Sequence, residues 1–186
     1  MKQLSAAIGI ALMAGGGTFA QGQKPTGTAG TDLAPVASAN LIDTQGRSVG
    51  QAHLQQTPHG VLLKLYLKNA TPGTHGLHIH DVGLCDRPSF TSAGSHFNPS
   101  GRQHGFLNPR GPHAGDLPNI DVPATMQLTV EYLVRDVTLE PGPESLLDAN
   151  GSTIVIHAGT DDYFTNPSGE SGDRMACGDV TGAEGR

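Results

Sequence analysis

Histidine is the residue type in this chain whose side chains could do the most chemistry. Seven of the nine histidines lie between residues 75 and 157. Two of them form the pattern His78-Ile79-His80. On a β-strand, residues i and i+2 point to the same face, so these two imidazoles share one face while Ile79 points to the other. Imidazole nitrogens suit copper and zinc, so the pattern predicts part of a metal site. The alternative is a pair of solvated surface histidines.

A third imidazole, that of His157, ends an apolar run. Ile154 and Ile156 share one face of that run, so a core position for both would turn His157 outward. The outer face of the sheet would then hold three imidazoles. An all-imidazole set with an open position suits a copper that alternates between oxidation states. Hydrolysis by a zinc-bound water is an alternative, although the sequence offers no obvious general base for it.

The segment from residue 81 to residue 122 adds three imidazoles and a carboxylate, from His96, His104, His113 and Asp116. These donors form a complete four-ligand set for Zn²⁺, and a site filled by protein ligands is structural. Such a site would tie down a long loop that has little core of its own. An imidazole has two ring nitrogens, so one loop histidine can contact both metals if two dications remove both of its protons. The alternative is a histidine-rich turn region without metal.

The elements that must position these residues are predicted to be short strands. Runs rich in Val, Ile, Leu and Thr are separated by turn residues, and they cover residues 37–42, 49–55, 61–68, 74–80, 125–134, 135–139 and 152–157. Such a pattern is typical of an all-β sandwich or barrel. Residues 81–122 and 158–174 lack it, and long loops of this kind are usually functional.

Composition and charge narrow the classes of function. The formal net charge is −6, from 11 basic and 17 acidic residues, which argues against a nucleic-acid partner. The same charge argues against simple electrostatic attraction of an anionic substrate. All the lysines lie in the first 68 residues. The length is that of one domain.

The N-terminus has the features of an export signal. A basic start precedes an apolar run over residues 4–14, which is shorter than the roughly 20 residues that a membrane span needs. We expect a secretory signal over 1–20, a flexible leader over 21–34 and the folded domain over 35–186, with no integral span in the mature chain. An uncleaved anchor is the alternative. The exported protein would be periplasmic, envelope-bound or extracellular, and there Cys85 and Cys177 most simply form one disulfide rather than two free thiols.

Six motifs occur in one order along the body of the chain: GLHIH, SAGSHFNP, QHG, PHAGDLPN, IVIHAGTDD and GDRMACG. In this order they closely resemble the copper/zinc superoxide dismutase family, over roughly residues 35–186, in its bacterial, exported type. The resemblance implies an eight-stranded antiparallel Greek-key barrel or sandwich of the immunoglobulin-like kind, with two long functional loops.

The resemblance also implies the metal sites, with one copper and one zinc per chain. The implied copper ligands are His78, His80, His96 and His157, and the implied zinc ligands are His96, His104, His113 and Asp116. The resemblance further implies that Asp161 is a carboxylate linking a copper ligand to a zinc ligand and that Arg174 stands beside the open copper position. It also implies that His75 is a structural, non-ligand histidine and that Cys85 and Cys177 form the intrachain disulfide.

The implied activity is dismutation of superoxide to dioxygen and hydrogen peroxide by a copper redox cycle. His96 would gain a proton during the cycle and pass it to peroxide, while Arg174 would supply positive charge for the anion. The loop before Arg174 departs from many members of the family, because residues 161–173 contain no lysine and are acidic. Candidate substitutes for steering are Arg87, Arg102 and Arg110.

A non-catalytic copper/zinc-binding relative that handles metal is the alternative function, since folds outlive their chemistry. A lost copper ligand or a lost arginine would favour it, and here every matched position is filled. A homodimer is one assembly that the resemblance allows.

Overall fold

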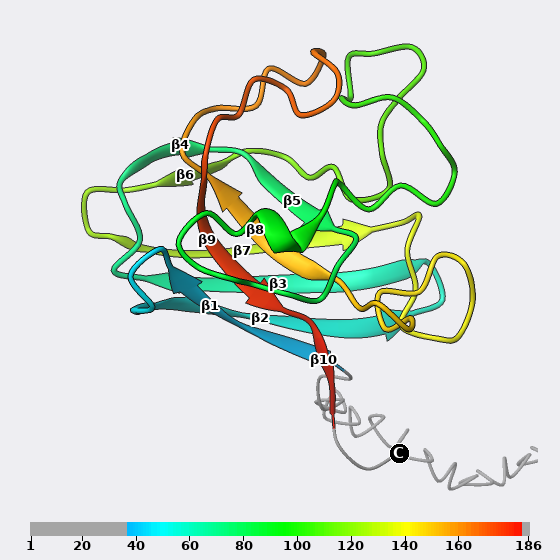
Figure 1. The fold of residues 1–186 in the computed structure, drawn as a ribbon, viewed down its shortest axis with the longest axis horizontal. Helices are drawn as coiled ribbons and strands as arrows, with labels where there is room; N and C mark the ends of the chain where they lie inside the picture. Colours follow the sequence, from blue (N-terminus) through cyan, green and yellow to red (C-terminus); the bar gives the residue numbers. More distant parts are fainter. Residues whose placement is uncertain (1–36, 184–186) are drawn as a thin grey trace, which may run out of the picture. The chain divides into compact units, whose positions relative to one another are not determined.

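The computed structural model describes residues 37–183, and Figure 1 shows that they form an all-β fold. The strands are β1 (Ala37–Asp43), β2 (Ser48–Thr57), β3 (Gly60–Lys68), β4 (Gly73–His75), β5 (Leu77–His80), β6 (Ile120–Val122), β7 (Gln127–Val134), β8 (Thr153–His157), β9 (Arg174–Asp179) and β10 (Thr181–Gly182). Among the described residues the one helical element is the 3-10 turn η1 (Thr91–Ala93).

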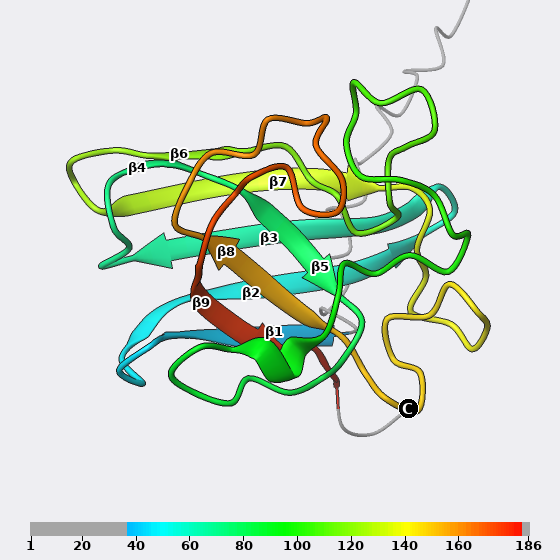
Figure 2. The same cartoon turned by 45° about the horizontal axis from the view of Figure 1, so that its top comes forward.

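The strands form one curled antiparallel sheet in the order β5-β8-β9-β1-β2-β3-β7, with β10 paired to β1. The short pair β4–β6 approaches β7 on one side and leads directly into β5 on the other, as Figure 2 shows. The predicted eight-stranded antiparallel fold with two long loops is therefore confirmed.

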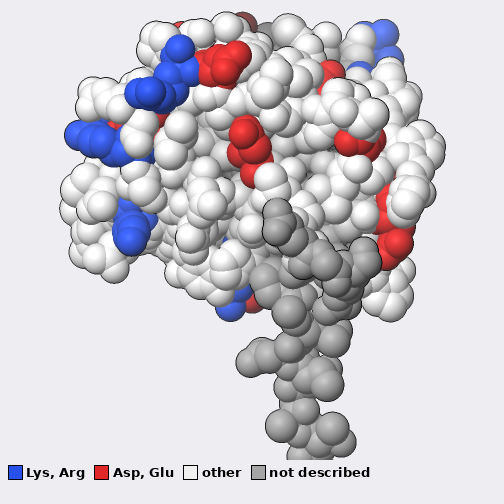
Figure 3. Space-filling model, turned by 60° about the horizontal axis from the view of Figure 1, so that its bottom comes forward, with Lys and Arg blue, Asp and Glu red and all other residues white. Residues whose placement is uncertain are grey.

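The core forms because apolar residues alternate with polar ones along the strands. In β3, Val61, Leu63, Leu65 and Leu67 are buried, while Lys64 and Tyr66 lie on the outer face. This alternation is what a sheet with one covered face requires. The outer face carries charge of both signs: Lys64 Nζ lies 3.0 Å from Glu131 Oε1, and Figure 3 shows acidic and basic side chains on one face of the molecule, with the basic ones mostly toward one edge.

Two strand predictions were wrong in detail. The run at 74–80 is interrupted at Gly76, where the N–H donates to the Gly159 carbonyl and an added Cβ would lie 2.9 Å from the Ser171 Cβ. The run at 135–139 is not a strand, because the Gln56 side chain accepts the Leu139 N–H at 2.7 Å in place of a neighbouring strand. The prediction also missed β6, β9 and β10.

The two long loops come together over β5 and β8, at the top of Figure 1. The predicted disulfide Cys85–Cys177 is confirmed, and it ties the first loop to β9 across 92 residues of sequence. In the chain-entropy model, closing a loop of that length contributes a little under about 5 kcal/mol. The bond therefore stabilises the folded state and holds the first loop against β9.

Asp179 offers a test of electrostatics beside this disulfide. Its carboxylate oxygen lies within 4.8 Å of both sulfur atoms, and burial and the charge of Asp86 raise the pKa of Asp179 above its ordinary value. A raised carboxyl pKa destabilises the fold once the pH exceeds the unfolded value. We expect Asp179→Asn to raise the free energy of unfolding at pH 7 by less than about 1 kcal/mol, since solvent screens the site. The gain should vanish below about pH 4.

Urea unfolding at pH 7 and pH 3.5 measures this difference. The matched control is Glu140→Gln, which removes an exposed charge elsewhere on the surface. An Asp179→Asn variant that is less stable than the parent at pH 7 contradicts the assignment.

Candidate metal centre

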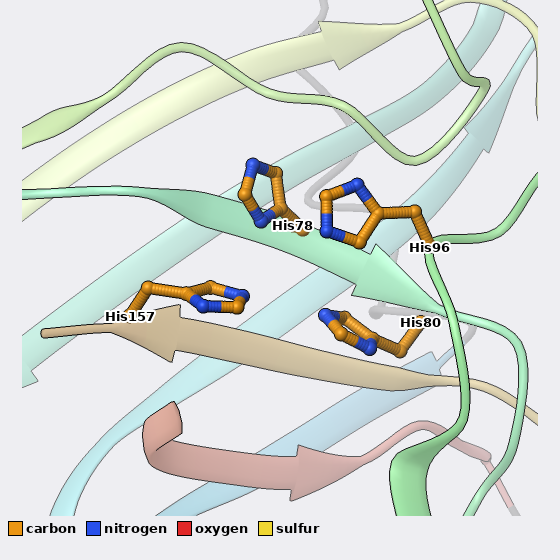
Figure 4. Close-up of side chains that lie close together, drawn as sticks. All are labelled: His78, His80, His96 and His157. Atoms are coloured by element: carbon orange, nitrogen blue, oxygen red, sulfur yellow. The ribbon is translucent and has the colours of Figure 1, made fainter. Parts of the chain in front are cut away.

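Four histidines converge at one end of the sheet, as Figure 4 shows. His78 and His80 extend from β5, His157 from the end of β8, and His96 from the first loop. All four side chains are buried beneath the loops and are therefore shielded from solvent, although they do not belong to the hydrophobic core. Their ligand atoms come within 4.8 Å of one another.

The nitrogens that face one another are buried and have no hydrogen-bond partner. They are His78 Nδ1, His80 Nε2, His96 Nε2 and His157 Nε2. A buried polar atom without a partner costs about 1–3 kcal/mol, so four such acceptors in one place form a donor set for a cation. All-imidazole donors suit copper, and these residues fit the metal that the resemblance implies.

The opposite ring nitrogens fix the orientation of these histidines. His80 Nδ1 donates to the Gly94 carbonyl at 3.1 Å, and His157 Nδ1 donates to the Gly172 carbonyl at 3.0 Å. Because a carbonyl only accepts, each contact places the proton on Nδ1 and leaves the Nε2 lone pair facing the cluster.

A second cluster surrounds Asp116. The Nδ1 atoms of His96, His104 and His113 lie 2.9, 3.1 and 3.2 Å from Asp116 Oδ1. Asp116 Oδ2 accepts the backbone N–H groups of Gly105 and His113, which orients the carboxylate. Three imidazoles and one carboxylate match the ligand types of a structural zinc. His96 belongs to both clusters, with Nε2 in the first and Nδ1 in the second.

Asp161 joins the two clusters from the second loop. Its Oδ2 accepts from His78 Nε2 at 2.8 Å, and its Oδ1 accepts from His104 Nε2 at 2.9 Å. Gly169 leaves room for this carboxylate, since an added Cβ there would lie 1.9 Å from Asp161 Oδ1. One carboxylate therefore orients a ring in each cluster.

Asn119 was missed by the sequence analysis. Its Oδ1 accepts the Asp161 N–H and its Nδ2 donates to the Asp161 carbonyl, both at 2.9 Å. Asn119 thereby fixes the backbone of Asp161, the residue that joins the two clusters. The signal was its position at the end of the PHAGDLPN motif, but an asparagine next to a proline also reads as an ordinary turn residue.

Burial and hydrogen bonding give the clusters different protonation states. Burial lowers the pKa of His96 to about 4 and that of His157 to about 3, so both are neutral at pH 7. Burial also acts on His104, but its hydrogen bonds to Asp116 and Asp161 outweigh it and raise the pKa of His104 to about 9. The same contacts hold the pKa values of both carboxyls well below their usual range.

These shifts predict the proton balance of metal loading. At pH 7.5 the metal-free protein carries a doubly protonated His104 ring, so a zinc ion bound at Nδ1, as the resemblance implies, would displace one proton. We expect zinc to release about one proton per chain. Zinc titration by calorimetry in two buffers of different ionisation enthalpy measures the number.

The released proton should disappear as the starting pH rises through about 9, where His104 is already neutral. Release that does not change between pH 7.5 and pH 10 would contradict the assignment.

Arg174 begins β9 and is partly buried. Its Nη1 donates to the Phe90 carbonyl at 2.6 Å and its Nη2 donates to the Gly94 carbonyl at 2.5 Å. It lines a cavity of about 510 Å³ in which it is the sole cation, with Asp173 as the sole acid, and the other lining residues are Thr44, Pro88, Ser89, Thr91 and Gly172.

The candidate steering arginines lie elsewhere. Arg102 lines a second cavity with His96 and His113. The Arg87 guanidinium packs over Gly46, and the Arg110 backbone N–H donates to Asn108 Oδ1 in the first loop.

The non-ligand histidine His75 links the sheet to the loops. Its Nδ1 donates to the His157 carbonyl at 2.9 Å, and its Nε2 lies 3.0 Å from the Thr71 carbonyl. Both contacts are to backbone oxygens, which is consistent with a structural role for His75.

Two adjoining donor clusters that share one imidazole, held by loops over a curled antiparallel sheet, define a binuclear metalloprotein. The family described as copper/zinc superoxide dismutase (SODC) matches residues 48–180, and the chain belongs to that family. Among curated relatives, Superoxide dismutase [Cu-Zn] 2 of Aquifex aeolicus is 42% identical over 180 residues, covering 96% of this chain and 98% of the relative. Superoxide dismutase [Cu-Zn] of Caulobacter vibrioides is 45% identical over 145 residues, covering 76% and 83%.

Solved structures show the same fold. A double mutant of a SOD-like protein from Bacillus subtilis has a TM-score of 0.75 and 41% identity, covering 78% of this chain and 97% of that one. The Cu/Zn superoxide dismutase from Brucella abortus has a TM-score of 0.60 and 25% identity, covering 78% and 99%.

The chain is therefore a superoxide dismutase, with superoxide as substrate and copper and zinc as cofactors. A non-catalytic role is not favoured, because several relatives over most of the chain are named as the enzyme. Within residues 37–183, no helix has the length and apolar character to cross a membrane.

Proposed function

We propose a specific division of the two metals between the two clusters. Copper is held by His78 Nδ1 and by the Nε2 atoms of His80, His96 and His157, and zinc is held by Asp116 and the Nδ1 atoms of His96, His104 and His113. The observation that carries the proposal is the convergence of four buried, unpartnered imidazole nitrogens. The contacts of three Nδ1 atoms with Asp116 support the zinc set.

When bound, a copper that alternates between two oxidation states supplies the electron transfer. The chain's own residues supply the rest. His96 Nε2 carries a proton in one half of the cycle and donates it to the departing peroxide, while its Nδ1 stays in the second cluster. Asp161 keeps the rings of His78 and His104 in place. Arg174 offers a fixed positive charge for the anion beside the first cluster.

Metal analysis with selective copper removal tests the division. The holoenzyme should contain one copper and one zinc per chain, and removal of copper alone should abolish dismutation while zinc is retained. Copper added back should restore the rate. A copper-free protein that keeps its activity would contradict the proposal. His80→Gln should lose copper and keep zinc, whereas His113→Gln should lose zinc first.

Export is proposed as well, with a signal over 1–20, a leader over 21–34 and the enzyme domain over 35–186. The first two segments lie outside the described residues. The apolar run near the N-terminus, the disulfide and the bacterial relatives support export. N-terminal sequencing of the protein recovered from the cell envelope or the medium tests the cleavage site, and a start at Met1 would contradict it.

A homodimer is the assembly we propose for the exported enzyme. Three exposed apolar side chains on the two loops support an interface there, those of Phe106, Leu107 and Phe164. Sedimentation equilibrium measures the mass of the holoenzyme, and Leu107→Glu should dissociate a dimer formed through these residues. A parent protein with the mass of one chain would contradict the assembly.

A further inference from the structure

Phe90 is a bulky residue in a backbone conformation that side chains rarely adopt. It has φ 55° and ψ 23°, in the left-handed region, directly before η1. Glycine reaches this region freely, but other residues stay there only when their surroundings hold them. Something in the fold must therefore stabilise Phe90 against relaxation.

The phenyl ring provides that stabilisation. It is completely buried in a small apolar cluster with Ala93, Val155 and the disulfide residue Cys177, separate from the main core. The Phe90 N–H donates to the Asp86 carbonyl at 2.9 Å, and the Phe90 carbonyl accepts the Ala93 N–H at 3.1 Å. The ring and these hydrogen bonds together fix the direction of the Phe90 carbonyl.

That carbonyl is one of two anchors of Arg174. Nη1 donates to it at 2.6 Å, while Nη2 donates to the Gly94 carbonyl at 2.5 Å. The two acceptors stand at either end of η1, which lies beside β9 in Figure 2. Gly94 takes its positive φ of 75° at little cost because it is glycine. Phe90 is the anchor whose conformation depends on a packed side chain.

We propose that Phe90 is a positioning residue for superoxide dismutation, because its buried ring holds the backbone that aims its carbonyl at Arg174. This inference rests on the role proposed above for Arg174. Phe90 acts through the guanidinium and not on the substrate. With a smaller side chain, residue 90 gains freedom to leave the left-handed region, its carbonyl turns away, and the cation loses one of two fixed contacts.

A double-mutant cycle on the holoenzyme tests the proposal. Phe90→Leu is made alone and together with Arg174→Gln. The dissociation constant of azide, a small anionic probe, is measured from the copper(II) absorption spectrum, and kcat/KM is measured for superoxide. Phe90→Leu should weaken azide binding and lower kcat/KM by about three- to tenfold, as expected when a charge-assisted hydrogen bond is partly lost. The double variant should be no worse than Arg174→Gln alone.

The matched control is Val155→Ala, in the same apolar cluster but without a hydrogen bond to Arg174. It should lower the unfolding midpoint and weaken azide binding much less than Phe90→Leu does, because the Phe90 ring itself stays in place. Phe90→Met serves in the same cycle if the leucine variant does not retain both metals.

Three results overturn the proposal: azide binding unchanged by Phe90→Leu, losses that add in the double variant, or an equal loss in Val155→Ala. Unchanged azide binding in Arg174→Gln itself contradicts the role of Arg174 instead, so the two failures are distinguishable.

Discussion

Arg174→Glu should lower kcat/KM for superoxide by about 10- to 100-fold, because local charge can change the rate of an anion's approach by such factors. Arg174 is the sole cation lining its cavity, and Asp173 lines the same space, so the reversal leaves the cavity lining purely acidic. The parent enzyme should slow as salt rises, since salt screens attraction. The variant should respond in the opposite direction, because screening then relieves repulsion.

Stopped-flow measurements of superoxide decay between 10 and 300 mM salt (about 30 to 6 Å of screening length) measure both effects. The matched control is Arg135→Glu, which makes the same change of net charge at an exposed residue directly after β7 that is not a candidate for steering. Metal content should equal that of the parent in both variants. If the Arg174→Glu enzyme has the same rate and salt response as the parent, the proposed role of Arg174 is contradicted.

Asp161→Asn should weaken zinc binding by about 10- to 100-fold, the usual effect of losing a partner that orients a metal ligand. The carboxylate accepts from His78 Nε2 and from His104 Nε2 at once. An amide has one oxygen, so its NH₂ group must face one of the two N–H donors. One ring in the centre loses its orientation, and the pKa of His104 falls because a negative partner is gone.

Competition with a chromogenic chelator measures the zinc affinity, and the copper(II) absorption spectrum reports the other cluster. Asp136→Asn is the matched control, since it makes the same chemical change at an exposed acid. It should bind zinc like the parent. Equal zinc affinity in Asp161→Asn and Asp136→Asn would contradict the role of Asp161 in joining the two clusters. Fewer protons released on zinc loading would show that His104 lost its partner.

The sequence predicted the parts of the fold and site that depend on side-chain pattern. The His78-Ile79-His80 spacing placed both imidazoles opposite a core residue, and Ile79 is fully buried. The loop motifs likewise led to residues that the structure brings within hydrogen-bond distance around Asp116. These successes share a cause, since residue type and strand period are visible in sequence.

The failures also share a cause. β9 has the sequence RMACGD, which lacks clean alternation, yet it lies in the middle of the sheet because β8 and β1 flank it. The carbonyls of Gly94 and Gly172 orient two of the histidines, but a backbone oxygen carries no residue-type signal. The imidazoles were expected on the outer face of the sheet. They lie there but are buried, because two loops distant in sequence cover them.

The Gly94 carbonyl has a consequence for how this chain can vary. It accepts from His80 Nδ1 and from Arg174 Nη2, so a single oxygen sets the spacing between a histidine of the metal centre and the nearby cation. The residue must stay glycine, because an added Cβ would lie 2.1 Å from Asp81 Oδ1. An insertion or deletion between Cys85 and Gly94 would shift both groups together. Length changes that surface loops ordinarily tolerate should therefore be rare in this short segment and common in the turns at the opposite end of the sheet.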